Sequence, residues 1–119
     1  MRNIFFLFSL IISVFSCKNS NNNVRFINES DVKIDSILLI GNIKCNPLII
    51  RDLLPNNSNI GILENCNESG GDGSYIVKIY VKNNELTKGF GYYTNGVMHF
   101  DEVEIKFTKN NTIIVNEKF

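Results

Sequence analysis

The side chain with the clearest catalytic potential is His99, because it is the only histidine among the 119 residues. A Ser-His-Asp or Cys-His arrangement would need it as the base. Asp101 and Glu102 follow it closely, but neighbouring residues of a strand point to opposite faces of a sheet. The chain has neither a Gly-x-Ser-x-Gly elbow nor a His-Glu-x-x-His zinc motif. We therefore expect His99 to be a hairpin or edge residue without a catalytic role, and the protein not to be an enzyme.

Oxygen-bearing side chains gather between Glu64 and Gly73, where three acids stand among Asn and Ser residues. Calcium prefers such surroundings, since it takes six to eight oxygen ligands. The spacing does not match the EF-hand loop, and the glycines fit a solvated turn that needs positive φ. We expect no metal and no cofactor, with calcium in this loop as the alternative.

Aromatic residues form the third group with chemical potential: Phe90, Tyr92, Tyr93 and Phe100. Strict alternation along a strand places Phe90 and Tyr92 on one face and Tyr93 on the other. If one face is core, the other exposes aromatic surface, which suits recognition of sugars or proteins. These four residues are a candidate recognition surface, and simple core packing is the competing interpretation.

The first residues of the chain form a secretory leader. Arg2 gives a positive start, and residues 4–15 form an apolar core that only Ser9 and Ser13 interrupt. About twelve apolar residues is the length of a signal-peptide core, whereas a transmembrane helix needs about twenty. The polar residues 19–23 end the run, so the pattern predicts a leader rather than a membrane span.

The end of this core, Val14-Phe15-Ser16-Cys17, resembles the lipobox of bacterial lipoproteins. The shared features are a branched aliphatic residue, a small residue before the cleavage point and the obligatory cysteine. The resemblance implies that the Cys17 thiol is diacylglycerylated, that the bond before it is cut and that the new amino group is acylated. The alternative is an ordinary signal peptide cleaved nearby, which would leave Cys17 free.

The lipobox divides the chain into a signal peptide (1–16), a lipidated polar tether (17–23) and one domain (24–119). Two or three acyl chains, at about 0.8 kcal/mol per buried CH₂ group, would hold such a domain on a bilayer. The membrane is thus an expected partner through lipid on Cys17. By resemblance to the Gram-negative sorting rule, Lys18 in place of Asp implies the outer membrane.

Two cysteines remain if Cys17 is lipidated, namely Cys45 and Cys66. An even pair in an exported domain is a candidate disulfide, which would contribute on the order of 3 kcal/mol. The competing interpretation is two buried or free thiols. A metal site is less favoured, because two cysteine ligands normally recruit histidine and His99 lies far along the chain.

The charge balance excludes one class of partner. The chain carries 12 basic and 12 acidic residues, and removal of the leader removes Arg2 and no acid, so the mature charge is about −1. Nucleic-acid binding needs clustered Lys and Arg, which are absent here. We expect no nucleic-acid partner.

Strand patterns dominate after the leader. Over 75–81 every second residue is apolar and shares one face, while Ile76 and Tyr80 add apolar weight to the face of Lys78. Apolar and charged residues alternate over 102–107, and a turn at 109–111 predicts a C-terminal hairpin. Asn95-Gly96 predicts a second hairpin over 90–98. Short β-branched runs occupy 24–28, 36–40 and 60–63, whereas 48–54 fits either a strand or one helical turn.

The order of these strands resembles immunoglobulin-like domains of exported bacterial proteins. Leu54-Pro55-Asn56, with the polar turn that follows, and Asp72-Gly73-Ser74-Tyr75, running into a strand, carry the resemblance. It implies an all-β fold, a small β-sandwich of about seven to nine strands. A chain of this length holds one such domain.

The leading functional hypothesis is a membrane-anchored lipoprotein with a non-enzymatic binding or structural domain, acting in the cell envelope and binding an envelope protein. The alternative is a periplasmic inhibitor or immunity-type protein that caps a toxin or hydrolase.

Overall fold

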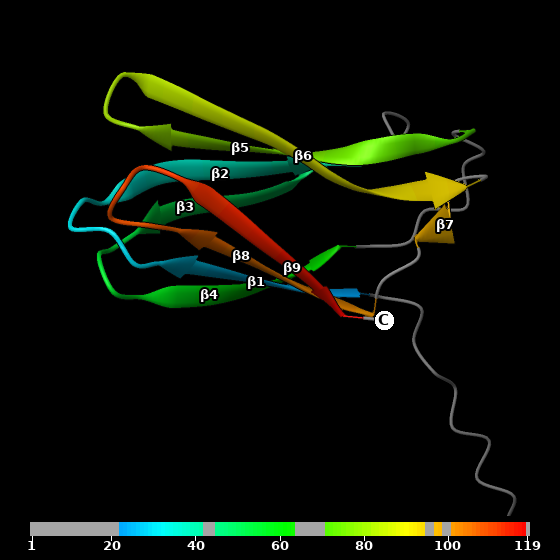
Figure 1. Ribbon diagram of the computed structural model, residues 1–119, viewed down its shortest axis with the longest axis horizontal. Coiled ribbons are helices and arrows are strands. Elements are labelled where there is room, and N and C mark those ends of the chain that lie inside the picture. The colour runs from blue at the N-terminus through cyan, green and yellow to red at the C-terminus, as the bar shows by residue number, and fades with distance from the viewer. Residues whose placement is uncertain (1–21, 42–44, 64–70, 95–96, 99–100, 119) are drawn as a thin grey trace, which may run out of the picture.

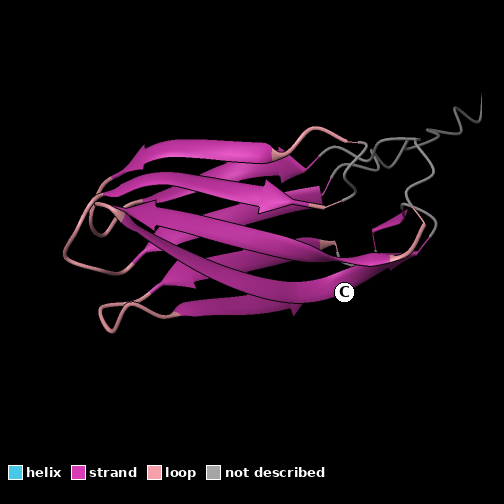
Figure 2. Cartoon of the chain, turned by 90° about the horizontal axis from the view of Figure 1, so that it is seen from above, coloured by secondary structure: helices cyan, strands magenta, loops and turns pink. Residues whose placement is uncertain are grey.

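The protein is a small β-sandwich, immunoglobulin-like in broad architecture. The computed structural model describes residues 22–41, 45–63, 71–94, 97–98 and 101–118. Within these ranges every regular element is a strand, and short loops join the strands (Figure 2). The nine strands form two sheets that pack face to face (Figure 1).

The first sheet has four strands in the order β4-β1-β8-β9. The bounds are β1 (Asn22–Asn28), β4 (Ser58–Leu63), β8 (Glu102–Phe107) and β9 (Ile113–Lys118). β1 is antiparallel to β4 and parallel to β8, and β8 and β9 form an antiparallel hairpin.

The second sheet has five strands in the order β3-β2-β5-β6-β7, and all its pairs are antiparallel. The bounds are β2 (Ile34–Ile40), β3 (Leu48–Leu53), β5 (Gly73–Val81), β6 (Asn84–Thr94) and β7 (Val97–Met98). The sheets approach each other at both sides, where β3 lies near β4 and β6 lies near β9.

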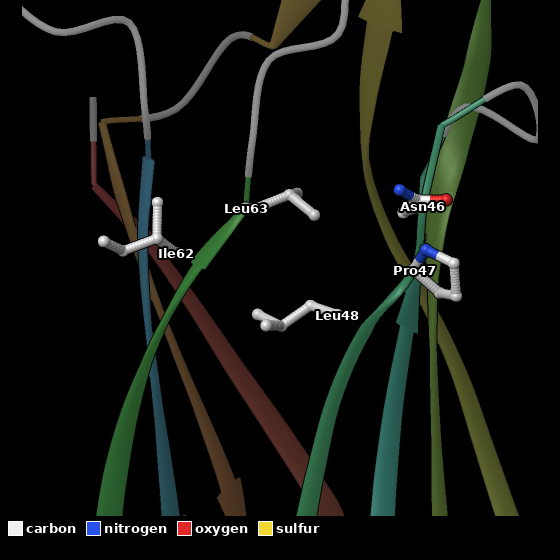
Figure 3. A pocket seen from close by; sticks show the side chains of 5 residues that line it. All are labelled: Asn46, Pro47, Leu48, Ile62 and Leu63. Atoms are coloured by element: carbon white, nitrogen blue, oxygen red, sulfur yellow. The ribbon is translucent and has the colours of Figure 1, made fainter.

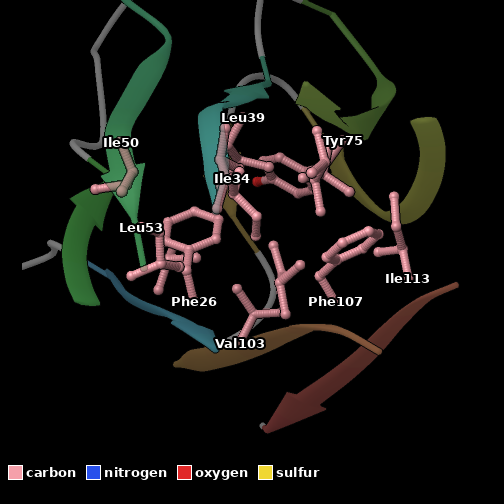
Figure 4. Close-up of a cluster of buried hydrophobic side chains, with 14 of the residues drawn as sticks. Phe26, Ile34, Leu39, Ile50, Leu53, Tyr75, Val103, Phe107 and Ile113 are labelled. Atoms are coloured by element: carbon pink, nitrogen blue, oxygen red, sulfur yellow. The ribbon is translucent and has the colours of Figure 1, made fainter. Parts of the chain in front are cut away.

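The core follows from the alternation of side chains. In β8, Val103, Ile105 and Phe107 are buried, whereas the charged residues between them are partly exposed. Alternate residues of β5 point inward in the same way. The inner faces of the two sheets thus supply one continuous hydrophobic core (Figure 4), whose largest fully buried members include Tyr75, Phe26 and Phe107.

Most predicted strands are confirmed, and the ambiguous segment 48–54 is a strand. Both predicted hairpins are present, as β6–β7 and β8–β9. The structure adds a hairpin that the sequence did not predict, between β5 and β6, with a two-residue turn in which Lys82 has a φ of 55°. β1 also begins at Asn22, so it includes the last two residues of the expected tether.

The two ends of the sandwich differ, and we name them separately. The turn end carries the connections 29–33, 54–57, 82–83 and 108–112. The leader end is the opposite one, where β1 begins at Asn22 and β4 ends (right in Figure 1).

Asn28 organises the turn end. Its Nδ2 donates to the carbonyl oxygens of Val32 at 2.7 Å and Leu53 at 3.0 Å. Its Oδ1 accepts from the backbone N of Ser30 at 3.0 Å and from the Ser30 hydroxyl at 2.6 Å. The side chain is fully buried. Asn28 therefore joins the end of β1, the connection 29–33 and the end of β3, which is a structural role.

Candidate functional site

The four aromatic residues do not form one surface. Tyr93 is buried and Phe90 packs against the core, whereas Tyr92 is 58% exposed. The predicted alternation, with Phe90 and Tyr92 on one face, is therefore wrong. The register between β5 and β6 shifts between Gly73 and Tyr75, because β6 contains one extra residue there. This bulge reverses the facing of the residues that follow it.

Phe90 and Tyr93 instead flank Tyr75 inside the leader end. The Phe90 ring stacks on the Tyr75 ring at a centroid distance of 5.4 Å, and the Tyr93 ring meets it edge-on at 5.5 Å. Such pairs contribute about 0.5–1.5 kcal/mol beyond the area they bury. These three residues are therefore an aromatic core cluster, and Phe100 lies outside the described residues.

Glycines make room for this cluster. A Cβ at Gly73 would collide with the Tyr93 hydroxyl, and a Cβ at Gly91 would collide with the Glu117 carboxylate. Gly91 also has a φ of 54°, which favours glycine. The close approach places Glu117, on the inner side of β9, near the ring of Tyr75.

The Tyr75 hydroxyl has an abnormal acidity. Burial raises the pKa of Tyr75 well above its ordinary value, and the nearby Tyr93 and Glu117 raise that pKa further. Tyr75 therefore stays neutral at a pH at which an exposed tyrosine ionises, which fits a structural role.

A pocket opens between the edge strands β3 and β4. It has a volume of about 270 Å³ and is lined by Asn46, Pro47, Leu48, Ile62 and Leu63. Figure 3 shows Leu48 and Leu63 in the space between the two strands. Pro47 and Ile62 are exposed, whereas Leu63 is buried, so the pocket leads from the surface toward the core.

The strand β4 beside this pocket exposes two isoleucines. Ile60 is 57% and Ile62 is 52% exposed, both on the outer face of the four-stranded sheet. Gly61, between them, faces inward, and the Leu48 side chain occupies the space that a Cβ there would need. The result is an apolar outer face and a close-packed inner face on one edge strand.

The strand pattern of the sequence did not reveal this edge. The available signal was the absence of charge over residues 58–63, whereas every other described strand of six or more residues contains a charged residue. The pocket could not have been foreseen, since it depends on which strands become neighbours across the two sheets.

The other candidate residues are only partly described. Cys45 is disulfide-bonded, but Cys17, Cys66 and His99 lie outside the described residues, so the predicted Cys45–Cys66 pairing stays a prediction. Of the loop considered for calcium, only Gly71 to Gly73 are described, and Gly71 has the expected positive φ of 67°. No group of three metal-ligating side chains occurs in the described ranges.

No protein-family model matches the chain, and a search of curated proteins found no match. Among solved structures, the chain is similar to a protein from Eubacterium rectale determined by NMR. The TM-score is 0.51 at 16% identity, over 82% of this chain and 88% of the other. This likeness supports the fold and carries no information on function.

The described residues include no helix that is long and apolar enough to cross a membrane.

Proposed function

We propose that the protein is a lipoprotein, anchored to a membrane of the cell envelope through acyl chains on Cys17. Its sandwich is a non-enzymatic binding domain. The lipobox residues Val14 to Cys17 support the anchor. The observation that carries the binding role is the edge strand β4, with Ile60 and Ile62 exposed beside a pocket that Leu48 and Leu63 line in part.

The anchor would fix the orientation of the domain. β1 begins at Asn22, five residues after Cys17. Five extended residues span at most about 18 Å. The leader end, with Ile62 and Leu63 of β4, would therefore lie close to the bilayer, whereas the first residues of β4 lie at the turn end, farther from it (Figure 1).

Exposed isoleucines on a soluble domain support a binding role. Isolated apolar residues on a surface are ordinary, but a contiguous apolar site beside a pocket marks an interaction surface. Ile62 belongs both to the exposed row and to the pocket lining, so the two features are contiguous.

The anchor is tested by the intact mass of the full chain extracted from bacterial membranes. We expect the mass of residues 17–119 plus acyl chains. Cys17→Ser should lose these chains and leave the membrane fraction. A soluble wild-type product without acyl chains would overturn the anchor.

The same spectrum tests the disulfide. If Cys17 is lipidated, Cys66 is the remaining partner for Cys45, and we propose that pairing. Reduction should then add about two daltons to the wild-type mass, and the Cys66→Ser variant should show no such change. An unchanged wild-type mass after reduction would contradict the pairing.

A further inference from the structure

We propose that β4 is a strand-addition site. An extended, uncharged segment of another protein would pair with β4 and extend the four-stranded sheet. This inference rests on the proposed binding role and names the class of partner. The pairing itself does not require the lipid on Cys17, and only the preference for a different protein over a second copy uses that anchor.

The backbone of β4 is available for pairing. β4 is an edge strand, bonded on one side to β1, and within the described residues no strand pairs with its other side. An open edge presents a row of N–H and C=O groups that another extended chain can satisfy. The ligand must therefore be a strand rather than a helix or a small molecule.

The four sheet edges differ in their protection. β3 carries Arg51 and Asp52, β6 carries Glu85 and Lys88, and β9 carries Glu117 and Lys118. Charged residues on an edge discourage pairing with other chains. β4, with the sequence Ser-Asn-Ile-Gly-Ile-Leu, has no charge. The edge strand β7 also has no charge, but it has only two residues, so β4 is the longer uncharged edge among the described strands.

Further cover protects the opposite side of the sandwich. The Lys88 side chain donates to the carbonyl oxygen of Ile113 at 3.0 Å, and β7 pairs with the end of β6. β4 has no such cover in the described part of the chain. The difference points to β4 as the edge at which pairing takes place.

The outer face sets the chemistry of the incoming strand. Ile62 lies opposite Asn23, and Ile60 lies opposite Arg25. Arg25 in turn lies opposite Glu104 of β8, which pairs with Lys106 at 3.2 Å, so these charges lie on the β1 side of β4 and not on its open side. An incoming strand would therefore place uncharged, β-branched side chains beside Ile60 and Ile62.

The inner face accepts one apolar side chain. Successive residues of a strand point to opposite faces, so a residue between two outer ones would point toward the space between β4 and β3. That space holds the pocket of about 270 Å³ lined in part by Leu48 and Leu63. It is large enough for a leucine-sized side chain.

A second copy of this chain fits less well than a different protein. Antiparallel pairing of β4 with β4 of a second copy would turn the second sandwich end for end. In the orientation proposed above, with the leader end of one copy at the bilayer, the leader end of the second copy would face away from that bilayer. Its Cys17 would then lie farther from the membrane by at least the length of the six-residue β4, about 20 Å, which a connection of about 18 Å does not span.

The test uses the full chain, purified in detergent, and a fluorescein-labelled probe with the sequence Lys-Thr-Ile-Leu-Ile-Thr-Lys. The two isoleucines of the probe would lie beside Ile60 and Ile62 on the outer face, and its leucine would enter the pocket. We expect saturable binding by anisotropy and slower hydrogen exchange of the β4 amides. Leucine to alanine in the probe should weaken binding by about tenfold.

Variants of the protein distinguish binding at the β4 edge from non-specific binding to exposed apolar residues. Ile60→Lys and Ile62→Lys should each weaken binding by about tenfold or more, since each puts a charge on the pairing edge. The matched control is Ile114→Lys, because Ile114 is also an isoleucine on an edge strand of the same sheet, 43% exposed. This control should bind the probe as the wild type does.

Two methylated probes test for backbone pairing. One carries N-methyl groups on its odd residues and the other on its even residues, so each loses the N–H donors of one edge. Strand addition predicts that one probe binds and the other does not. Equal binding or equal loss by both would overturn the inference, as would no slowing of exchange in β4.

Two further outcomes are distinguishable. A stable dimer of the full chain without probe, lost in Ile60→Lys, would replace the proposed partner by a second copy. The Cys17→Ser full chain should still bind the probe. A failed lipid measurement therefore overturns the anchor alone, whereas a failed probe measurement overturns the strand addition.

Discussion

The turn end and the leader end of this sandwich are stabilised by different interactions, hydrogen bonds at one and aromatic packing at the other. At the turn end one buried amide, Asn28, bonds the chain at Ser30, Val32 and Leu53. At the leader end the ring of Tyr75 packs between Phe90 and Tyr93. Hydrogen bonds fix position by direction, whereas ring packing fixes it by shape and contact area.

The backbone shows the same difference. The four non-glycine residues with positive φ, among the described residues, lie at or next to the turn end: Asp52, Asn56, Lys82 and Asn111. The two glycines with positive φ, Gly71 and Gly91, lie toward the leader end. Asn and Asp adopt positive φ in turns more readily than most residues, whereas Gly91 at the leader end has no room for a side chain beside Glu117 and Tyr75.

The largest effect should come from removing the central ring of the leader end. Tyr75→Ala would leave a cavity between Phe90 and Tyr93, and loss of a buried aromatic side chain costs about 3–5 kcal/mol. Denaturant unfolding of the full chain measures this cost. Tyr92→Ala is the control, because Tyr92 is largely exposed on the same part of β6. Equal losses of unfolding free energy in both variants would show that the aromatic core cluster does not contribute more to stability than an exposed tyrosine.

A somewhat smaller effect is expected at the turn end. Asn28→Ala removes two donors and one acceptor, which leaves the carbonyls of Val32 and Leu53 without this partner. Unsatisfied buried polar groups cost about 1–3 kcal/mol each, so we expect a loss of about 2–4 kcal/mol. Asn110→Ala, in an exposed turn, is the matched control and should change stability by less than about 0.5 kcal/mol. An unchanged midpoint for Asn28→Ala would contradict the role of this amide.

The bulge at Gly91 gives the third prediction. Gly91→Ala should cost about 1–3 kcal/mol, because an L side chain is strained at positive φ and would meet the Glu117 carboxylate. Adding Glu117→Ala to Gly91→Ala should recover the part of the lost stability that comes from the collision with the carboxylate. The part that comes from the strained φ should remain. A double-mutant cycle by chemical unfolding separates the two. Strict additivity would mean that Gly91 and Glu117 do not interact.

The periodic parts of the fold were predictable from sequence. Alternation identified β5 and β8 because every second residue of each strand is apolar and buried, and in β8 the residues between them are charged. Asn95-Gly96 identified the β6–β7 hairpin because its turn chemistry is distinctive. The β5–β6 hairpin was missed because Lys82-Asn83 is not such a signature, although Lys82 adopts positive φ there.

The candidate site was harder to predict for two physical reasons. One extra residue in β6 reverses the facing of Tyr92 and Tyr93, and no local pattern announces a bulge of this kind. The exposed edge of β4 depends on sheet order, which places residues 58–63 beside β1 and leaves their other side open. Both are properties of pairing between distant segments rather than of the segments themselves.

The smallest predicted effect concerns pH and follows from Tyr75. Its pKa is raised in the folded protein above the ordinary 10.0, mainly by burial. The neutral form is therefore favoured by folding, so the stability is complete below pH 10 and declines as pH rises above 10. The slope for one such group is at most about 1.4 kcal/mol per pH unit. Tyr75→Phe keeps the ring and removes the titrating hydroxyl, so its stability should decline less between pH 10 and 11 than that of the wild type. Equal declines in urea unfolding would mean that the hydroxyl of Tyr75 reaches water, and that the leader end is packed more loosely than the turn end.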